Sequence, residues 1–178
     1  MIDILRFDPC AEGANGLAAQ PDARTAWESC SRSDWMIWLL RKVFDVDDKR
    51  FRLAACDIAE SVLHLVAPGE DRPRIAIETA RGWLAGTATL KELDAAVRGA
   101  RAAADDAYST AAAAAYAAAN AADAAADAYS AAAAGYPSAG YPSAYAAAAT
   151  AYNRKQRHVN CDILRKHFDL EAVLEALT

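Results

Sequence analysis

The chain has 178 residues, of which 54% are hydrophobic and 24% are charged, and its formal net charge is −5. This length is typical of one domain and is enough to bury about 70% of the unfolded surface. The acidic balance argues against duplex DNA as the main partner, because non-specific DNA binding depends on neutralising phosphates. Basic protein surfaces remain open as partners.

The four cysteines, Cys10, Cys30, Cys56 and Cys161, are scattered without metal-ligand or disulfide-framework spacing. We interpret them as buried, reduced thiols. No basic-then-apolar leader opens the sequence, and no apolar run approaches the ~18 residues of a membrane span. We therefore expect a cytoplasmic protein without a membrane partner.

Helix signals recur along the N-terminal half, after an irregular start through DPCAEGANG. The first predicted helix lies in PDARTAWESC, because Pro21 and Asp22 are residues that a helix N-terminus favours, and it directs Trp27 inward. The second lies in SDWMIWLLRKVF, where Ser33 can cap and a broad apolar face suits the centre of a core. That face consists of Trp35, Ile37, Trp38, Leu39, Leu40 and Val43.

Two further helices are predicted before the composition changes. One begins at Asp47 or Asp48 and continues through KRFRLAACDIAESVLHLV until Pro68 and Gly69 end it. The next, EDRPRIAIETARGWLAG, starts with acidic residues and a proline and stops at Gly86.

An alanine-rich tract follows. Thr89 precedes Glu92 by three residues, the spacing of a capping box, and the tract from Leu90 to Ala134 is predicted to be helical. A straight helix of that length would measure about 67 Å at ~1.5 Å per residue, far longer than a compact domain of this size. We therefore expect either a break between Ser109 and Asn120 or a long projecting hairpin.

The tandem GYPSA repeat supplies the turn of that hairpin. Prolines disfavour helix at the preceding tyrosines, so Gly135 to Ser143 is predicted to be a connector. A last long helix returns from Ala144 to Phe168, and Asp169 can cap a short terminal helix. The predicted fold is one all-α domain, a helical bundle with a long Ala-rich helical hairpin. Residues 1–88 form the core helices, 89–168 the hairpin with its turn at 135–143, and 169–178 the terminal helix.

Polar residues of the tract recur at steps of three, four or seven, which places them on one stripe of a helix. They are Asp105, Ser109, Tyr116, Asn120, Asp123, Asp127 and Ser130. The stripe is interpreted as a solvated edge, with weak cation binding as the alternative.

The common catalytic signatures for phosphate loops, dinucleotide binding and zinc proteases do not occur. GYPSAG differs from a nucleophile elbow in the position of Ser138 and in its helical context. His64 lies four residues after Glu60, and His158 four before Asp162, but two ligands are too few for a metal site. We expect no enzyme activity, no metal and no cofactor.

Two charged segments remain as candidate binding sites. GEDRPR places Glu70, Asp71, Arg72 and Arg74 at a helix start, where they serve either the helix terminus or a partner. The last long helix is basic. Its positive side chains either form a solvated face or bind an anion. The alternative anion-binding residues are Arg154, Lys155 and Arg157.

Several blocks together resemble a family of bacterial and phage immunity proteins. They are TAWESCSRSDWMIWLL, RLAACDIAESVLHLV, GEDRPRIAIETARGWLAGTATL, the Ala/Tyr/Asp tract and CDILRKHF, which span most of the chain from about Asp8 to Phe168. The resemblance implies neutralisation of a toxin or effector by direct protein binding, without catalysis. Oligomerisation is left open.

The predicted partner-binding face combines Glu70, Asp71, Arg72 and Arg74 with Asp105, Asp123 and Asp127. One alternative function is a phage counter-defence protein that inhibits a bacterial defence complex such as CRISPR or sequesters its nucleotide signal. Another is a structural Ala-rich helical protein.

Overall fold

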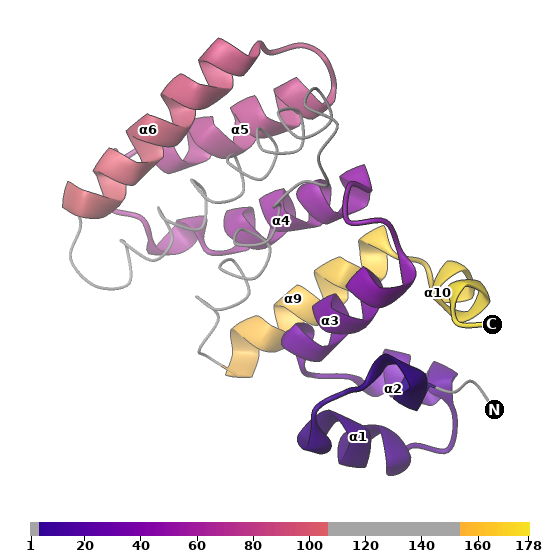
Figure 1. The fold of residues 1–178 in the computed structure, drawn as a ribbon. Helices are drawn as coiled ribbons and strands as arrows, with labels where there is room; N and C mark the ends of the chain where they lie inside the picture. The colour runs from indigo at the N-terminus through magenta and orange to yellow at the C-terminus, as the bar shows by residue number, and fades with distance from the viewer. Residues whose placement is uncertain (1–3, 107–153) are drawn as a thin grey trace.

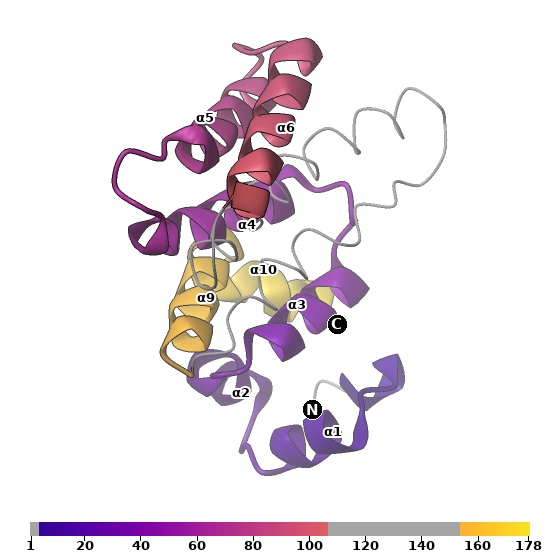
Figure 2. The same cartoon turned by 90° about the vertical axis from the view of Figure 1, so that its left-hand side faces the viewer.

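The structure, a computed structural model, describes residues 4–106 and 154–178 (Figure 1). These residues form an all-α fold, in which no strand occurs. Helices α5 and α6 lie side by side at one end, α4 lies next to them, α3 and α9 follow, and α1 and α2 form the opposite end (Figure 2). The elements are η1 (Ile4–Phe7), α1 (Ala11–Ala18), α2 (Ala23–Ser29), α3 (Ser33–Val43), α4 (Lys49–Ser61), η2 (Leu63–Leu65), α5 (Arg72–Leu84), α6 (Leu90–Asp106), α9 (Arg154–His167) and α10 (Leu170–Ala176).

The first core lies between α4, α5 and α6, and it is built mainly from small and β-branched residues. Ala59, Ala80 and Ala100 are completely buried there, one from each helix, and Leu93 belongs to the same cluster. Alanine at such positions lets helix axes approach closely, because little side chain separates the two backbones. This core is therefore formed by consecutive helices of the chain.

The second core joins α3 to the C-terminal helices. Ile37 and Leu40 of α3 pack with Leu164 and with Phe168, which follows α9. The Phe168 ring lies 4.7 Å from that of Phe51, measured between centroids. Helix α9 is thus a core helix. Most of the predicted hairpin, including its turn at 135–143 and the break expected between 109 and 120, lies outside the described residues.

Several helix ends lie where local signals predict them. Asp22 caps α2, because its Oδ1 accepts a hydrogen bond from the Thr25 backbone N at 2.7 Å. The capping box before α6 is formed: the Thr89 N–H donates to Glu92 Oε2 at 2.7 Å, and the Glu92 N–H donates to Thr89 Oγ1 at 3.3 Å. Gly86 has a φ of +76°, a conformation that glycine adopts without strain, and it follows α5.

Other helix-end predictions were wrong in detail. Ser33 is the first residue of α3 and is buried, and the capping position belongs to Arg32, whose side chain makes no capping bond. Helix α4 ends at Ser61, and the predicted continuation to Pro68 is the separate turn η2. Asp169 precedes α10 as predicted, but its side chain makes no capping hydrogen bond.

The predicted irregular start was also wrong, because residues 11–18 form α1. Its N-terminus is capped by a sulfur: Cys10 Sγ accepts from the Gly13 N–H at 3.4 Å. Glycine normally disfavours a helix interior. Here Gly16 is required by packing, since a Cβ at that position would lie 2.7 Å from Cζ3 of Trp35.

Candidate binding pocket

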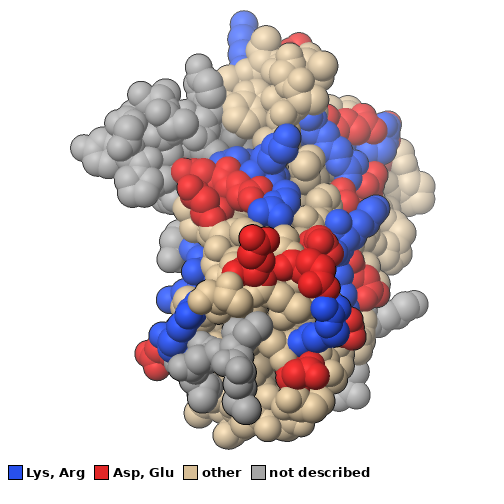
Figure 3. Space-filling view, turned by 90° about the vertical axis from the view of Figure 1, so that its right-hand side faces the viewer, with Lys and Arg blue, Asp and Glu red and all other residues tan. Residues whose placement is uncertain are grey.

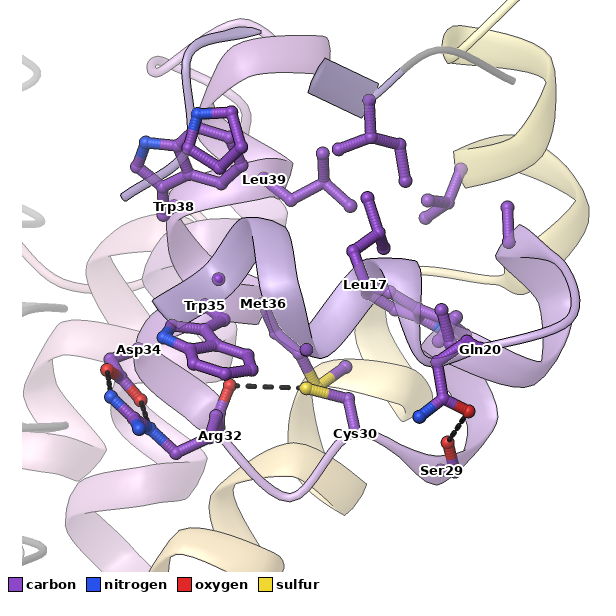
Figure 4. A pocket seen from close by; sticks show the side chains of 18 of the residues that line it. Leu17, Gln20, Ser29, Cys30, Arg32, Asp34, Trp35, Met36, Trp38 and Leu39 are labelled. Atoms are coloured by element: carbon purple, nitrogen blue, oxygen red, sulfur yellow. Dashed lines mark hydrogen bonds and ion pairs between the residues drawn. The ribbon is translucent and has the colours of Figure 1, made fainter. Parts of the chain in front are cut away.

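A partly open cavity of about 450 Å³ lies between α1, α2, α3 and α10, and we call it the tryptophan pocket. Trp27 belongs to its lining and is buried. Met36 lines it as a buried residue, whereas Trp35, Trp38 and Leu39 are half-buried there (Figure 4). Most of the exposed lining is apolar. The pocket can therefore accept an apolar group from outside.

The structure corrects the predicted place of two tryptophans. Met36, Ile37 and Leu40 provide the buried side of α3, and they are at most 2% exposed. A helix that buries this side places Trp35 and Trp38 on the opposite side, roughly 150° away, because neighbouring residues are about 100° apart around the axis. The sequence analysis did not identify this pocket, although three tryptophans between residues 27 and 38 are an available signal.

Arg32 fixes one wall of the tryptophan pocket. Its guanidinium carbon lies 4.4 Å from the ring centroid of Trp35. The same guanidinium donates to Asp34, with Nε to Oδ1 at 3.0 Å and Nη2 to Oδ2 at 2.7 Å, and to Glu12 at 2.8 Å. The bonds from Arg32 lower the pKa of Asp34 although burial opposes this shift. The pocket rim is thus charged, internally paired and held in place before any ligand binds.

The GEDRPR stretch forms an ion-pair cluster at the start of α5. The Glu70 carboxylate accepts from the Arg72 backbone N at 3.0 Å and from its Nε at 2.8 Å. These bonds lower the pKa of Glu70 to about 2. Arg72 Nη2 also donates to Asp106 at 3.0 Å, which ties α5 to the last residue of α6. This arrangement provides the helix-terminus role that the sequence left open.

The rest of the predicted partner-binding face is only partly described. Arg74 pairs with Asp71 at 2.8 Å and with Glu78 at 2.9 Å. Asp105 is exposed on α6, so it shares the end of the molecule that holds GEDRPR, whereas the tryptophan pocket lies at the other end (Figure 1). Asp123 and Asp127 lie outside the described residues. On the face drawn in Figure 3, positive and negative side chains are interspersed.

The positively charged residues of α9 differ in burial and in hydrogen bonding. The side chains of Arg154 and Lys155 lie outside the description, and Arg157 is half-buried. Arg165 is structural: its Nη2 donates to the carbonyl oxygens of Trp27 at 2.9 Å and Cys30 at 2.6 Å. These bonds join α9 to the end of α2.

The histidine pairs do not gather into a metal site. His64 Nδ1 lies 3.0 Å from the Ser61 carbonyl oxygen, while Glu60 accepts from Arg81 at 2.6 Å. His158 is exposed, and its neighbour Asp162 pairs with Arg165. Within residues 4–106 and 154–178, no group of three or more metal-ligating side chains occurs.

The sequence analysis missed a partly buried ion-pair network that connects α4, α5 and α9. Asp57 of α4 accepts from Arg81 of α5 at 2.5 Å and lies 2.8 Å from Nε2 of His167 of α9. Burial alone would raise the pKa of Asp57, but the bonds to His167 and Arg81 outweigh it and lower the pKa. The network joins the helices of the two cores. The three residues are too far apart in sequence for a motif to indicate their contact.

The described residues form an all-α fold with an apolar, tryptophan-lined pocket. No protein family, curated protein or solved structure matches the chain. None of the described helices combines the length and apolar character that crossing a membrane requires.

Proposed function

We propose that this protein is a non-enzymatic inhibitor of the immunity-protein kind, which neutralises a toxin or effector by binding it. In this proposal the tryptophan pocket takes an apolar side chain of the partner. The observation that carries it is the pair of half-buried tryptophans, Trp35 and Trp38, around an apolar cavity. The resemblance to immunity proteins supports a protein as the partner.

The composition of the pocket favours a protein interface. Tryptophan and arginine are enriched among the residues that dominate binding energy at such interfaces. Arg32 is already held by Asp34 and Glu12, so binding need not immobilise it. Pre-organisation of this kind raises affinity because less side-chain entropy is lost on association. The cavity of about 450 Å³ is as large as pockets that hold small molecules, which measure ~300–1,000 Å³. It therefore has room for one bulky apolar side chain of a partner.

The charges around GEDRPR serve a different role in this proposal. Glu70, Asp71, Arg72 and Arg74 are paired with neighbours, and paired surface charges mainly steer association and exclude wrong partners. The exposed Asp105 belongs to the same end of the molecule. Reversing these charges should therefore change the association rate and its salt dependence more than the affinity.

The pocket can be tested with a displayed library of random peptides. The wild-type chain should enrich peptides that contain a large apolar residue. Trp38→Glu places a charge in the pocket and should weaken the enriched peptides at least tenfold. Ile75→Glu is the matched control, because Ile75 is 45% exposed on α5, far from the pocket, and this variant should bind as wild type. Circular dichroism checks that both variants are folded.

Cyclic dinucleotides form the second arm of this experiment, measured by isothermal titration calorimetry. Absence of binding agrees with protein recognition. Binding that Arg157→Glu abolishes would replace the proposal with nucleotide sequestration. A library that yields no binder, or binders that Trp38→Glu leaves unchanged, would overturn the pocket as the site. For a partner found in this way, its activity should fall linearly with added protein and vanish at a 1:1 ratio.

A further inference from the structure

Two cysteines that are distant in sequence meet beside the tryptophan pocket. Cys30 follows α2 and lines the pocket as a half-buried residue, whereas Cys161 lies in α9 and is completely buried. Cys30 packs against the core cluster that contains Cys161. Arg165, one helical turn after Cys161, donates to the Cys30 carbonyl oxygen at 2.6 Å, and neither cysteine is in a disulfide. One sulfur of the pair can thus be reached from the pocket, and the other lies behind it.

The surroundings of Cys30 favour its thiolate. The hydrogen bond from Cys161 is the main cause that lowers the pKa of Cys30 to about 7; burial opposes it, and the Arg165 charge assists. Asp34 opposes the shift only weakly, as the last of these causes. The Arg165 guanidinium is anchored next to the thiol, since it donates to the Cys30 carbonyl oxygen at 2.6 Å. In the opposite sense, the Cys30 Sγ donates a long hydrogen bond to the Arg32 carbonyl oxygen, 3.5 Å away, which favours the protonated thiol (Figure 4).

The other cysteines provide internal contrasts. Burial raises the pKa of Cys56 to about 12, so this thiol is protonated and unreactive at neutral pH. The hydrogen bond to Cys30 and burial raise the pKa of Cys161, so its thiol keeps its proton. Cys10 is exposed, so the expectation of four buried thiols was wrong for it, and it caps α1. Among the described residues, only the pair of Cys30 and Cys161 combines a cysteine that lines the pocket with a second cysteine in the core cluster against which it packs.

We propose that Cys30 and Cys161 form a peroxide-reactive dithiol, which closes to a disulfide between the end of α2 and α9. The Cys30 thiolate attacks one oxygen of hydrogen peroxide; the O–O bond breaks, a sulfenic acid forms on Cys30, and the departing hydroxide takes a proton to become water. The Cys161 sulfur then attacks the Cys30 sulfur, the S–O bond breaks, and the hydroxyl leaves as water with the Cys161 proton. Two thiols are oxidised by two electrons in total, and one peroxide is reduced to two waters.

Closure of this disulfide would alter the tryptophan pocket. The Cys30 sulfur is part of the pocket lining, and the bond would draw it toward Cys161 in the core. The bond would also link residues 30 and 161 covalently, which restricts the unfolded chain and moves the urea midpoint to a higher concentration.

The test treats the full chain with an equimolar amount of hydrogen peroxide at pH 7. The mass should fall by two hydrogens, and digestion without reductant should yield one cross-linked peptide pair containing Cys30 and Cys161. Dithiothreitol should reverse both changes. In Cys161→Ser, the sulfenic acid on Cys30 should persist and be trapped by dimedone. Cys10→Ser is the matched control and should close its disulfide at the wild-type rate.

Several results would overturn this proposal. They are a cross-link that contains Cys10, dimedone labelling of Cys56, or thiol loss that continues unchanged in Cys30→Ser. If Cys161→Ser does not fold, the cross-linked peptide of the wild-type chain decides alone. None of these measurements needs the partner, so the proposal succeeds or fails separately from the proposed function.

Discussion

Gly16→Ala tests the packing of α1 against the Trp35 indole. The substitution gains helix propensity of about 1 kcal/mol. However, its methyl carbon would lie 2.7 Å from Cζ3 and 2.9 Å from Cη2 of Trp35, whereas carbon atoms in contact prefer about 3.5–4.0 Å. The indole must therefore move, and overpacking of this kind costs about 1–3 kcal/mol. We expect a net loss of up to about 2 kcal/mol in the free energy of unfolding.

Gly13→Ala is the control in the same helix. Its nearest neighbours would be Cys10 Sγ at 3.4 Å and Pro9 Cβ at 3.7 Å, which are ordinary contacts, so it should stabilise the protein by up to about 1 kcal/mol. Urea unfolding followed by circular dichroism gives both values. In a Trp35→Ala background the clash is gone, and Gly16→Ala should become stabilising, with a coupling of about 1–3 kcal/mol. Equal stabilisation by both glycine substitutions, or zero coupling, would refute this packing.

Three other predictions concern the cores and the helix ends. Phe168→Ala should lower the free energy of unfolding by about 3–5 kcal/mol in urea titrations, because Phe168 is fully buried, and a loss below about 1 kcal/mol would contradict its core position. Thr89→Ala should lower it by about 1 kcal/mol, since it removes the capping box, whereas Thr79→Ala in α5 should change it by less than about 0.5 kcal/mol. The pKa of Glu70 is lowered from 4.5 to about 2, so its contribution to stability is present above pH 4.5 and is lost as the pH falls toward 2. Glu70→Gln should flatten that part of the stability profile, and identical profiles for the two proteins would count against the bond to Arg72.

Local signals predicted those helix ends whose whole motif lies within a few residues. The Thr89 and Glu92 capping box needs only residues three apart, so the sequence contains the whole motif. Helix α1 was missed because its glycines disfavour a helix locally, and the reason for Gly16 is a ring of α3. Propensity cannot show such a reason, because tertiary packing overrides it.

The candidate site was harder to predict for a related reason. Apolar residues occur all around α3, so some of them must lie away from its buried side. Which ones remain depends on where α1, α9 and α10 pack, and this places Trp35 and Trp38 at the pocket. The contact between Cys30 and Cys161 likewise depends on α9 returning to the N-terminal helices.

The two cores are built from segments that leave the ribosome at different times, and this has a consequence for folding during translation. The first core needs only residues between 55 and 100, so it can form soon after α6 leaves the ribosome. The second core needs Cys161 against the face of α3 that ends at Leu40, 121 positions earlier (161 − 40). At translation rates of ~5–20 residues per second, that face waits roughly 6 to 24 s for its partner helix. During this interval Met36, Ile37 and Leu40 are open to chaperones and to other nascent chains, so aggregation during expression should depend on how fast the alanine-rich segment is translated.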